Sequence, residues 1–397
     1  MTFYFIAGEP SSLMTMANTA YVIKKVNPNY IVEAIIPYHD FLVKMEVQEF
    51  LDGFDKVWYL PWCEFQKNIF RGLFMGRAFK KAMKSIVFNE NSIVFVFSSM
   101  VMTLNLLVKH ISEKHKSIKV VLLSYVSKQI EVTELGGKFS ILLTFLNSLY
   151  SFMLGCYPMK SYINANGQLM YREYFRQLPF PTIVLSVNQV EGKAESELPA
   201  ARQIVLPYPI VMRDKGQTEK QEKFVVFFGD TTITDYYVQL DKQFLINKTT
   251  QYVNAISDYY AKKNIKVYYK PHPYDGEKLM AGCESSGMSL FRERINAEML
   301  FSKYHDSLVA VYTVSSHSVL FGSKNGIPAY WAYEYCFDNE GLKKSFRKVT
   351  LDNKSRLLRN LSELGQIGSI DDDKIKIDMN KMVESWEKGV QTLITTV

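Results

Sequence analysis

The sequence predicts an α/β protein of two domains, each built on a parallel β-sheet with helices on both faces. Three observations predict this fold class. The chain has 397 residues, more than one hydrophobic core ordinarily organises. Short apolar runs alternate with helix-like stretches in both halves, as buried parallel strands and their crossover helices require. Between the halves the composition becomes polar and charged, as in an interdomain linker.

The predicted domain boundaries follow from that change in composition. We expect a Rossmann-like first domain over residues 1–187, a linker region over 188–222 and a second Rossmann-like domain over 223–373. Residues 374–397 indicate an amphipathic helix, because their apolar side chains recur with helical spacing. Such a stripe must pack on something, so we expect this helix to cross back onto the first domain.

The strands are predicted from short apolar runs. In the first half these runs are Phe3–Ile6, Ile31–Ile36, Lys56–Leu60, Ser92–Phe97, Val120–Tyr125 and Thr182–Leu185. In the second half they are Phe224–Phe228, Ile265–Tyr269 and Leu308–Val311, with a helix around Asp241–Lys262 after the first of them.

The net charge indicates the kind of partner, and the cysteine spacing bears on metal binding and redox compartment. The formal net charge is +7, which suits a phosphate-bearing partner such as a nucleotide or an anionic membrane. It is too mild to indicate nucleic acid, and no nucleic-acid motif occurs. The cysteines, Cys63, Cys156, Cys283 and Cys336, do not stand at metal-ligand spacing from another Cys or from a His. We therefore expect isolated thiols in a reducing cytoplasm, and no metal or other cofactor.

Two segments raise the question of membrane contact. The opening MTFYFIAG lacks a basic leader and a cleavage site, which favours a first strand over a signal peptide. Ile141–Leu154 is strongly apolar but shorter than the roughly 20 residues of a spanning helix, so we expect a buried or membrane-facing helix. Basic residues also gather on one helical face, which is either a solvated face or an interfacial helix. They are Arg77, Lys80, Lys81 and Lys84.

A histidine between two prolines follows a predicted strand of the second half. In KVYYKPHPYDG, Lys270 and Pro271 precede His272, and Pro273 follows it. The prolines fix the backbone and keep a helix from starting there. The imidazole is then held at the carboxyl end of a parallel strand, where open α/β sheets bind ligands. A lone histidine is more often structural, but this context favours function.

Paired serines, Ser315 and Ser316, stand between the predicted strand ending at Val311 and a helix over about residues 318–324. Serines at a helix N-terminus can simply cap it. Together with backbone N–H groups and the helix dipole they can instead bind an anion. The KPHP segment one βα-unit upstream favours the anion site.

Three carboxylates of the second half are further candidates. Glu298 lies among apolar neighbours in INAEML, either as a first-turn acid or as an acceptor for a ribose diol. Asp230 and Asp235 follow the strand ending at Phe228, where they either meet a substrate or cap the next helix.

The order of these motifs resembles that of the bacterial sialyltransferases and polysialyltransferases of GT-B fold. The resemblance covers about residues 224–335 by motif and the whole chain by layout. It implies two Rossmann-like domains that face a central cleft, and a CMP-sugar donor. It also implies that His272, beside Lys270 and Pro273, contacts the CMP phosphate and assists its departure. The paired serines would hold the same phosphate, and Glu298 the cytidine ribose.

The same resemblance calls for two adjacent acids before a glycine in the first domain, as the general base. Here Glu131 and Glu134 precede a glycine pair but are not adjacent. Glu134 is the first choice for the base and Glu131 the second. The opening loop with Gly8, Glu9 and Ser11 follows the first strand, where such enzymes bind substrate; its role stays open.

The resemblance therefore implies an inverting, metal-independent transferase that moves sialic acid, or a related nonulosonic acid, to a hydroxyl of a glycan or lipid-linked glycan. Lipopolysaccharide, O-antigen or capsule synthesis would be its setting, at the inner face of the bacterial inner membrane.

Two alternatives stay open. Kdo transferases and CDP-glycerol-type polymerases share similar motifs and use CMP- or CDP-donors. A non-catalytic nucleotide- or carbohydrate-binding protein of the same fold is the other alternative, and loss of the acidic motif would favour it.

Overall fold

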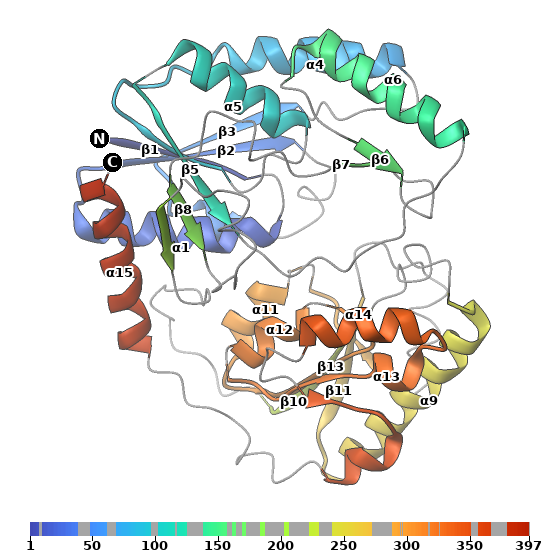
Figure 1. Ribbon diagram of the computed structural model, residues 1–397. Helices are drawn as coiled ribbons and strands as arrows, with labels where there is room; N and C mark the ends of the chain where they lie inside the picture. The colour runs from blue at the N-terminus through green and yellow to red at the C-terminus, as the bar shows by residue number, and fades with distance from the viewer. Residues whose placement is uncertain are drawn as a thin grey trace. The chain divides into compact units, whose positions relative to one another are not determined.

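The structure, a computed structural model, consists of two compact units, each built on its own parallel sheet (Figure 1). The first unit holds the described residues up to 205 and those from 379 onward, and the second holds those from 222 to 366. The described residues are 1–7, 10–38, 48–61, 69–96, 102–115, 117–124, 138–156, 161–163, 169–171, 183–186, 202–205, 222–229, 240–271, 288–293, 295, 297–316, 318–324, 326–350, 356–366 and 379–396.

The first unit is a seven-stranded parallel sheet in the order β3-β2-β1-β4-β5-β8-β9. Its strands are β1 (Thr2–Ile6), β2 (Ile31–Tyr38), β3 (Lys56–Pro61), β4 (Ile93–Val96), β5 (Lys119–Ser124), β8 (Ile183–Ser186) and β9 (Arg202–Val205). The helices are α1 (Pro10–Val26), α3 (Gln48–Leu51), α4 (Ile69–Met83), α5 (Met102–Lys114), α6 (Lys138–Leu154) and α15 (Met379–Thr396). An antiparallel pair, β6 (Ser161–Ile163) and β7 (Leu169–Tyr171), lies outside the sheet.

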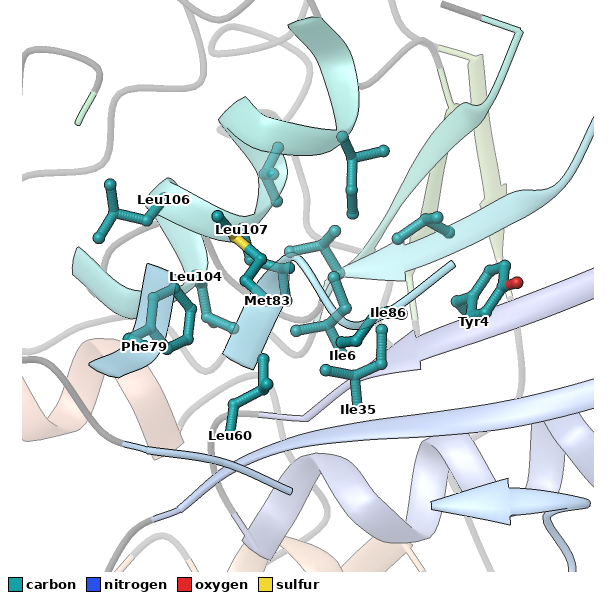
Figure 2. Close-up of a cluster of buried hydrophobic side chains, with 14 of the residues drawn as sticks. Tyr4, Ile6, Ile35, Leu60, Phe79, Met83, Ile86, Leu104, Leu106 and Leu107 are labelled. Atoms are coloured by element: carbon teal, nitrogen blue, oxygen red, sulfur yellow. The ribbon is translucent and has the colours of Figure 1, made fainter. Parts of the chain in front are cut away.

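One face of this sheet carries the cluster of buried apolar side chains in Figure 2. Tyr4, Ile6 and Ile35 project from the strands toward α4 and α5. Phe79 is fully buried and brings α4 into this core, and Leu107 does the same for α5. Alternate residues of β1 point to opposite faces, so Phe3 and Phe5 are equally buried on the other side.

Helices α1 and α15 lie together on the first unit, so the C-terminal helix returns to the first sheet after the chain has built the second (Figure 1). Trp386, Val390 and Leu393 form its inner stripe and are fully buried. An ion pair between Lys25 and Glu387 ties the two helices together at the surface. The predicted amphipathic stripe is therefore the packing face of this helix.

The second unit is a six-stranded parallel sheet in the order β12-β11-β10-β13-β14-β15. Its strands are β10 (Phe224–Phe228), β11 (Lys266–Lys270), β12 (Ser289–Leu290), β13 (Leu308–Thr313), β14 (Ala329–Trp331) and β15 (Arg356–Leu357). The helices are α9 (Lys242–Ala261), α11 (Ala297–Tyr304), α12 (Ser318–Lys324), α13 (Tyr333–Cys336), α14 (Glu340–Thr350) and the 3₁₀ helix η2 (Leu361–Gln366).

Close packing fixes α12 against the centre of this sheet. A Cβ added at Gly322 would lie 2.6 Å from Cγ2 of Val311 and 3.4 Å from the Phe301 ring. Val311 belongs to β13, and Phe301 belongs to α11. The Phe301 ring also lies 5.8 Å, centre to centre, from the ring of Phe228 in β10. Glycine at this position lets α12 approach both β13 and α11 closely.

The observed elements confirm the predicted alternation and extend several strands. β13 runs to Thr313, two residues beyond the predicted end, and β11 is displaced by one residue to Lys266–Lys270. Helix α9 lies within the helix expected around Asp241–Lys262, and the structure adds that Asp241 is its N-cap. The short strands β14 and β15 were not predicted; each has three residues or fewer and shows no periodicity of its own.

The apolar segment from Ile141 lies within α6, which has 17 residues. Among the described residues, no helix has both the length and the apolar character to cross a membrane. The prediction that this segment does not span is consistent with that finding.

Candidate functional site

The second sheet reverses its winding direction between β10 and β13. From β10 the chain adds β11 and then β12 on one side, and from β13 it adds β14 and β15 on the other. In open α/β sheets, ligands bind outside the carboxyl ends of the strands at such a reversal. The candidate site is therefore at the ends of β10 and β13, with β11 as the next strand.

The register aligns three residues across this edge. Phe228, the last residue of β10, lies opposite Lys270 of β11 and opposite Thr313 of β13. Strands that pair in a sheet are about 4.8 Å apart, so Lys270 and Thr313 flank Phe228 at close range. We call these three residues the edge row.

An irregularity in β13 sets this register. Phe224 pairs with Leu308, whereas Val225 pairs with Ala310, so β13 contains one extra residue between the two pairs. Without that residue, Phe228 would face Tyr312 in place of Thr313. Such bulges redirect the side chains that follow them, and here the bulge brings a threonine to the end of the strand.

The Thr313 hydroxyl connects the edge row to the turn that follows β13. Its Oγ1 donates to the carbonyl of Phe228 at 3.2 Å and accepts from the backbone N–H of Ser316 at 3.0 Å. The Thr313 carbonyl in turn accepts from the N–H of Ala332 at 3.0 Å, beyond the end of β14. Thr313 is fully buried, so a single side chain fixes both the end of β10 and the path toward α12.

The paired serines differ in accessibility and in bonding. Ser315 is buried, whereas Ser316 is half-buried. The Ser316 hydroxyl donates to Oγ of Ser318 at 3.1 Å and accepts from the Ser318 N–H at 3.3 Å. These are the bonds of a hydroxyl that organises the start of a helix. Anion binding by Ser316 thus stays a prediction, and it would require the hydroxyl to exchange these local bonds for a ligand.

Lys270 is a buried cation at the other end of the edge row. Its side chain and backbone are 8% exposed, and its Nζ stands 5.4 Å from the centre of the Phe291 ring. The face of an aromatic ring attracts a cation and partly offsets the cost of removing it from water. The Lys270 carbonyl accepts from the N–H of Gly229 at 2.8 Å, so β10 and β11 remain joined past their ends.

The other predicted site residues lie largely outside the described part of the chain. Glu298 and Ser11 belong to α11 and α1, but their side chains are outside it. The remaining residues, Gly8, Glu9, Glu131, Glu134, Asp230, Asp235, His272 and Pro273, are outside it altogether. Of the predicted set, the structure therefore brings Lys270, Ser315 and Ser316 to one edge of one sheet.

The described residues include neither a metal-binding cluster nor an activated thiol. No cluster of three His, Cys, Asp or Glu side chains in the described residues could hold a metal ion. Cys156 and Cys336 are buried free thiols, and burial raises the pKa of the Cys336 thiol to about 12. A thiol that stays protonated is a poor nucleophile. Independence from metal remains a prediction from the sequence.

Comparisons with known proteins identify the fold. No protein-family model matches the sequence, and neither does any curated protein. Among solved structures, the UDP-GlcNAc 2-epimerase of Methanocaldococcus jannaschii is similar at a TM-score of 0.54 and 10% identity, over 100% of both chains. Another UDP-N-acetylglucosamine 2-epimerase has a TM-score of 0.53 and 12% identity, over 100% of this chain and 95% of the other. The M. jannaschii enzyme in complex with UDP-GlcNAc and UDP has a TM-score of 0.51 and 11% identity, again over 100% of both chains.

This similarity confirms the predicted fold class, a GT-B-type chain with two parallel α/β sheets. At such low identity it shows the fold alone. What the protein does must be argued from its own residues.

The hydrogen bonds of Thr313 predict a specific loss on substitution. Thr313→Val keeps the shape of the side chain but leaves the Ser316 N–H and the Phe228 carbonyl without this partner. An unsatisfied buried polar group costs about 1–3 kcal/mol, so the midpoint of thermal unfolding should fall by several degrees. Thr313→Ser, which retains the hydroxyl, should lose clearly less. Equal midpoints for the two variants would show that the hydroxyl does not hold this edge.

Proposed function

We propose that the protein is an inverting glycosyltransferase that takes sialic acid, or a related nonulosonic acid, from a CMP-activated donor. The observation that carries the proposal is the edge row at the reversal of the second sheet. The two motif segments continue directly from its outer members. His272 follows Lys270 by two residues, and Ser316 follows Thr313 by three.

The chemistry of the edge favours a phosphate. Lys270 supplies a positive charge, Ser315 and Ser316 supply hydroxyls, and Thr313 fixes the turn that carries the two serines. The described residues at the ends of β10, β11 and β13 include no Asp or Glu that would repel an anion. A buried cation beside hydroxyl donors is the arrangement that stabilises a phosphate and the charge that develops on it.

The comparisons support a nucleotide-sugar substrate, and the sequence motifs support its cytidine form. A protein of the same fold is known in complex with UDP-GlcNAc and UDP, which makes a nucleotide-sugar a natural ligand for this fold. The choice of CMP, as against UDP, rests on the KPHP segment, Glu298 and the paired serines. In this proposal Glu298 accepts hydrogen bonds from the ribose.

The proposed reaction is a single displacement at C2 of the donor sugar. The acceptor oxygen forms a bond to C2 while the bond from C2 to the phosphate oxygen breaks, and its electron pair leaves with CMP. The proton of the acceptor hydroxyl passes to a carboxylate, for which Glu134 is the first candidate. Negative charge develops on the departing phosphate, where His272, Lys270 and Ser316 would stabilise it.

Nucleotide specificity gives the first test of this proposal. CMP and CDP should raise the midpoint of thermal unfolding more than UMP, UDP or GDP do. A nucleotide present at a hundred times its dissociation constant adds about 2.7 kcal/mol to stability, which a thermal-shift measurement resolves. A clear preference for UDP would contradict the CMP donor and leave a UDP-sugar enzyme of the same fold.

A companion assay separates an enzyme from a binding module. Slow hydrolysis of CMP-sialic acid without an acceptor is expected of the transferase, because water can take the place of the acceptor. A protein that binds CMP tightly and never hydrolyses the donor would support the non-catalytic alternative.

Substitution of the candidate base gives the next prediction. Glu134→Gln keeps the size of the side chain but removes the group that accepts the proton. Transfer should fall by about two to four orders of magnitude, whereas the affinity for CMP should be retained because the proposed nucleotide site is in the second unit. The measurement is the initial rate of transfer beside the dissociation constant for CMP.

Glu131→Gln is the matched control, three residues away and with the same change in charge. It should transfer at nearly the normal rate. If Glu131→Gln is the inactive variant, the second choice is the base. If both are active while Asp230→Asn or Asp235→Asn is inactive, the base comes from the second domain.

A further inference from the structure

The outer face of α6 is apolar, whereas the exposed face of a surface helix is usually polar. Phe145, Leu149 and Phe152 recur at positions i, i+4 and i+7, so they form one stripe. Phe145 is 61% exposed and Phe152 is 79% exposed. Met153 beside them is also exposed, and α6 contains no acidic residue.

Helix α6 packs on the core of the first unit through the face opposite this stripe. The opposite face of α6 carries Tyr150 and Leu154, which are buried in the core cluster of the first unit. Leu154 also contacts α4, because a Cβ at Gly76 would collide with its side chain. Helix α6 is therefore anchored along its inner face, and its aromatic side chains are held outward.

Helix α4 lies against α6 (Figure 1) and presents cations beside this stripe. Phe74 is 71% exposed, and Arg77 and Lys81 follow it at i+3 and i+7 on the same outer face. Lys84, just past the end of the helix, is exposed as well. Residues 69–88 and 138–156 contain no Asp or Glu. We call the exposed side chains of the two helices the α4–α6 surface.

We propose that the α4–α6 surface docks the protein on an anionic lipid bilayer. Large apolar side chains next to lysine and arginine are what an interfacial helix needs, since the rings enter the boundary between headgroups and acyl chains while the cations meet lipid phosphates. A second copy of the chain fits less well. A two-fold contact through this surface would join two copies of the same basic patch, Arg77, Lys81 and Lys84, without an acidic residue in either helix to pair with them.

The proposal is independent of the reaction, because it rests on the first unit alone and its test involves no donor sugar. The full chain is mixed with vesicles of phosphatidylcholine, with or without phosphatidylglycerol, and the bound fraction is measured by flotation. We expect binding to the phosphatidylglycerol vesicles, weaker binding in high salt, and little binding to phosphatidylcholine alone.

Two sets of substitutions test the two components. Arg77→Gln, Lys81→Gln and Lys84→Gln together remove three charges, and partitioning should fall by about a hundredfold, since each cation near an anionic surface contributes roughly fivefold. Phe145→Ser with Phe152→Ser should reduce it by about tenfold or more, because the apolar area entering the interface is lost. Both sets lie on the surface, so thermal unfolding should change little.

Control variants remove the same number of exposed cations and of exposed apolar side chains elsewhere on the protein. Lys119→Gln, Lys262→Gln and Lys344→Gln remove three exposed charges from other elements, and Phe244→Ser with Ile246→Ser removes exposed apolar side chains from α9. These variants should bind vesicles like the unaltered chain. Absence of binding to phosphatidylglycerol vesicles overturns the proposal, as does equal loss in the controls. A dimer that dissociates on Phe152→Ser, in a chain that never binds vesicles, would show that a second copy covers the surface.

Discussion

The pairing of β10 with two partners at once is the constraint on which the second unit depends. Phe228 can lie opposite both Lys270 and Thr313 only because β13 contains one extra residue near its start. The register beyond that point is held from one face by Tyr312, whose hydroxyl is hydrogen-bonded to that of Tyr260 from α9 at 2.8 Å. A shift by one residue would exchange Tyr312 and Thr313. It would break this buried hydrogen bond and also remove the hydroxyl that joins β10 to the turn before α12.

Much of the architecture could be predicted from apolar periodicity, because buried parallel strands and their crossover helices differ in length and pattern. The end of β13 could not be predicted in this way. Tyr312 and Thr313 are polar enough to mark the end of an apolar run, and only their complete burial between β10 and β14 keeps them in the sheet. The strands β14 and β15 form by pairing with the neighbouring strand of the sheet. Their own sequences are too short to show a strand pattern.

Some features of the candidate site could likewise be predicted from the sequence, and others could not. The motifs around His272 and the paired serines are legible in the sequence, and so is their place after strands. Thr313 was missed, although a threonine two residues after the predicted strand end at Val311 and three residues before Ser316 was a signal available to find it. The role of Ser316 could not be read from the chain alone. Its hydroxyl serves the start of α12 in the structure, and a phosphate would compete with that role.

Burial also bears on the two interpretations of the basic helix α4, a solvated face or an interfacial helix. Phe74 and Phe79 are equivalent in the sequence, but Phe79 is fully buried in the core and Phe74 is 71% exposed beside the cations. An exposed ring among cations supports the proposed interfacial helix over a purely solvated basic face. The orientation follows from Gly76, which seats α4 on α6, and it could not be deduced without knowing which helix α4 packs on.

In the proposed function, the nucleotide phosphate binds at the edge row of the second sheet. A crystal structure of the protein with CMP tests it most directly. We expect the phosphate outside the ends of β10 and β13, within hydrogen-bonding distance of Ser316 and near Lys270, with the Ser316 hydroxyl turned from Ser318 toward the ligand. A phosphate bound elsewhere on the chain, with the bonds between Ser316 and Ser318 intact, would contradict it.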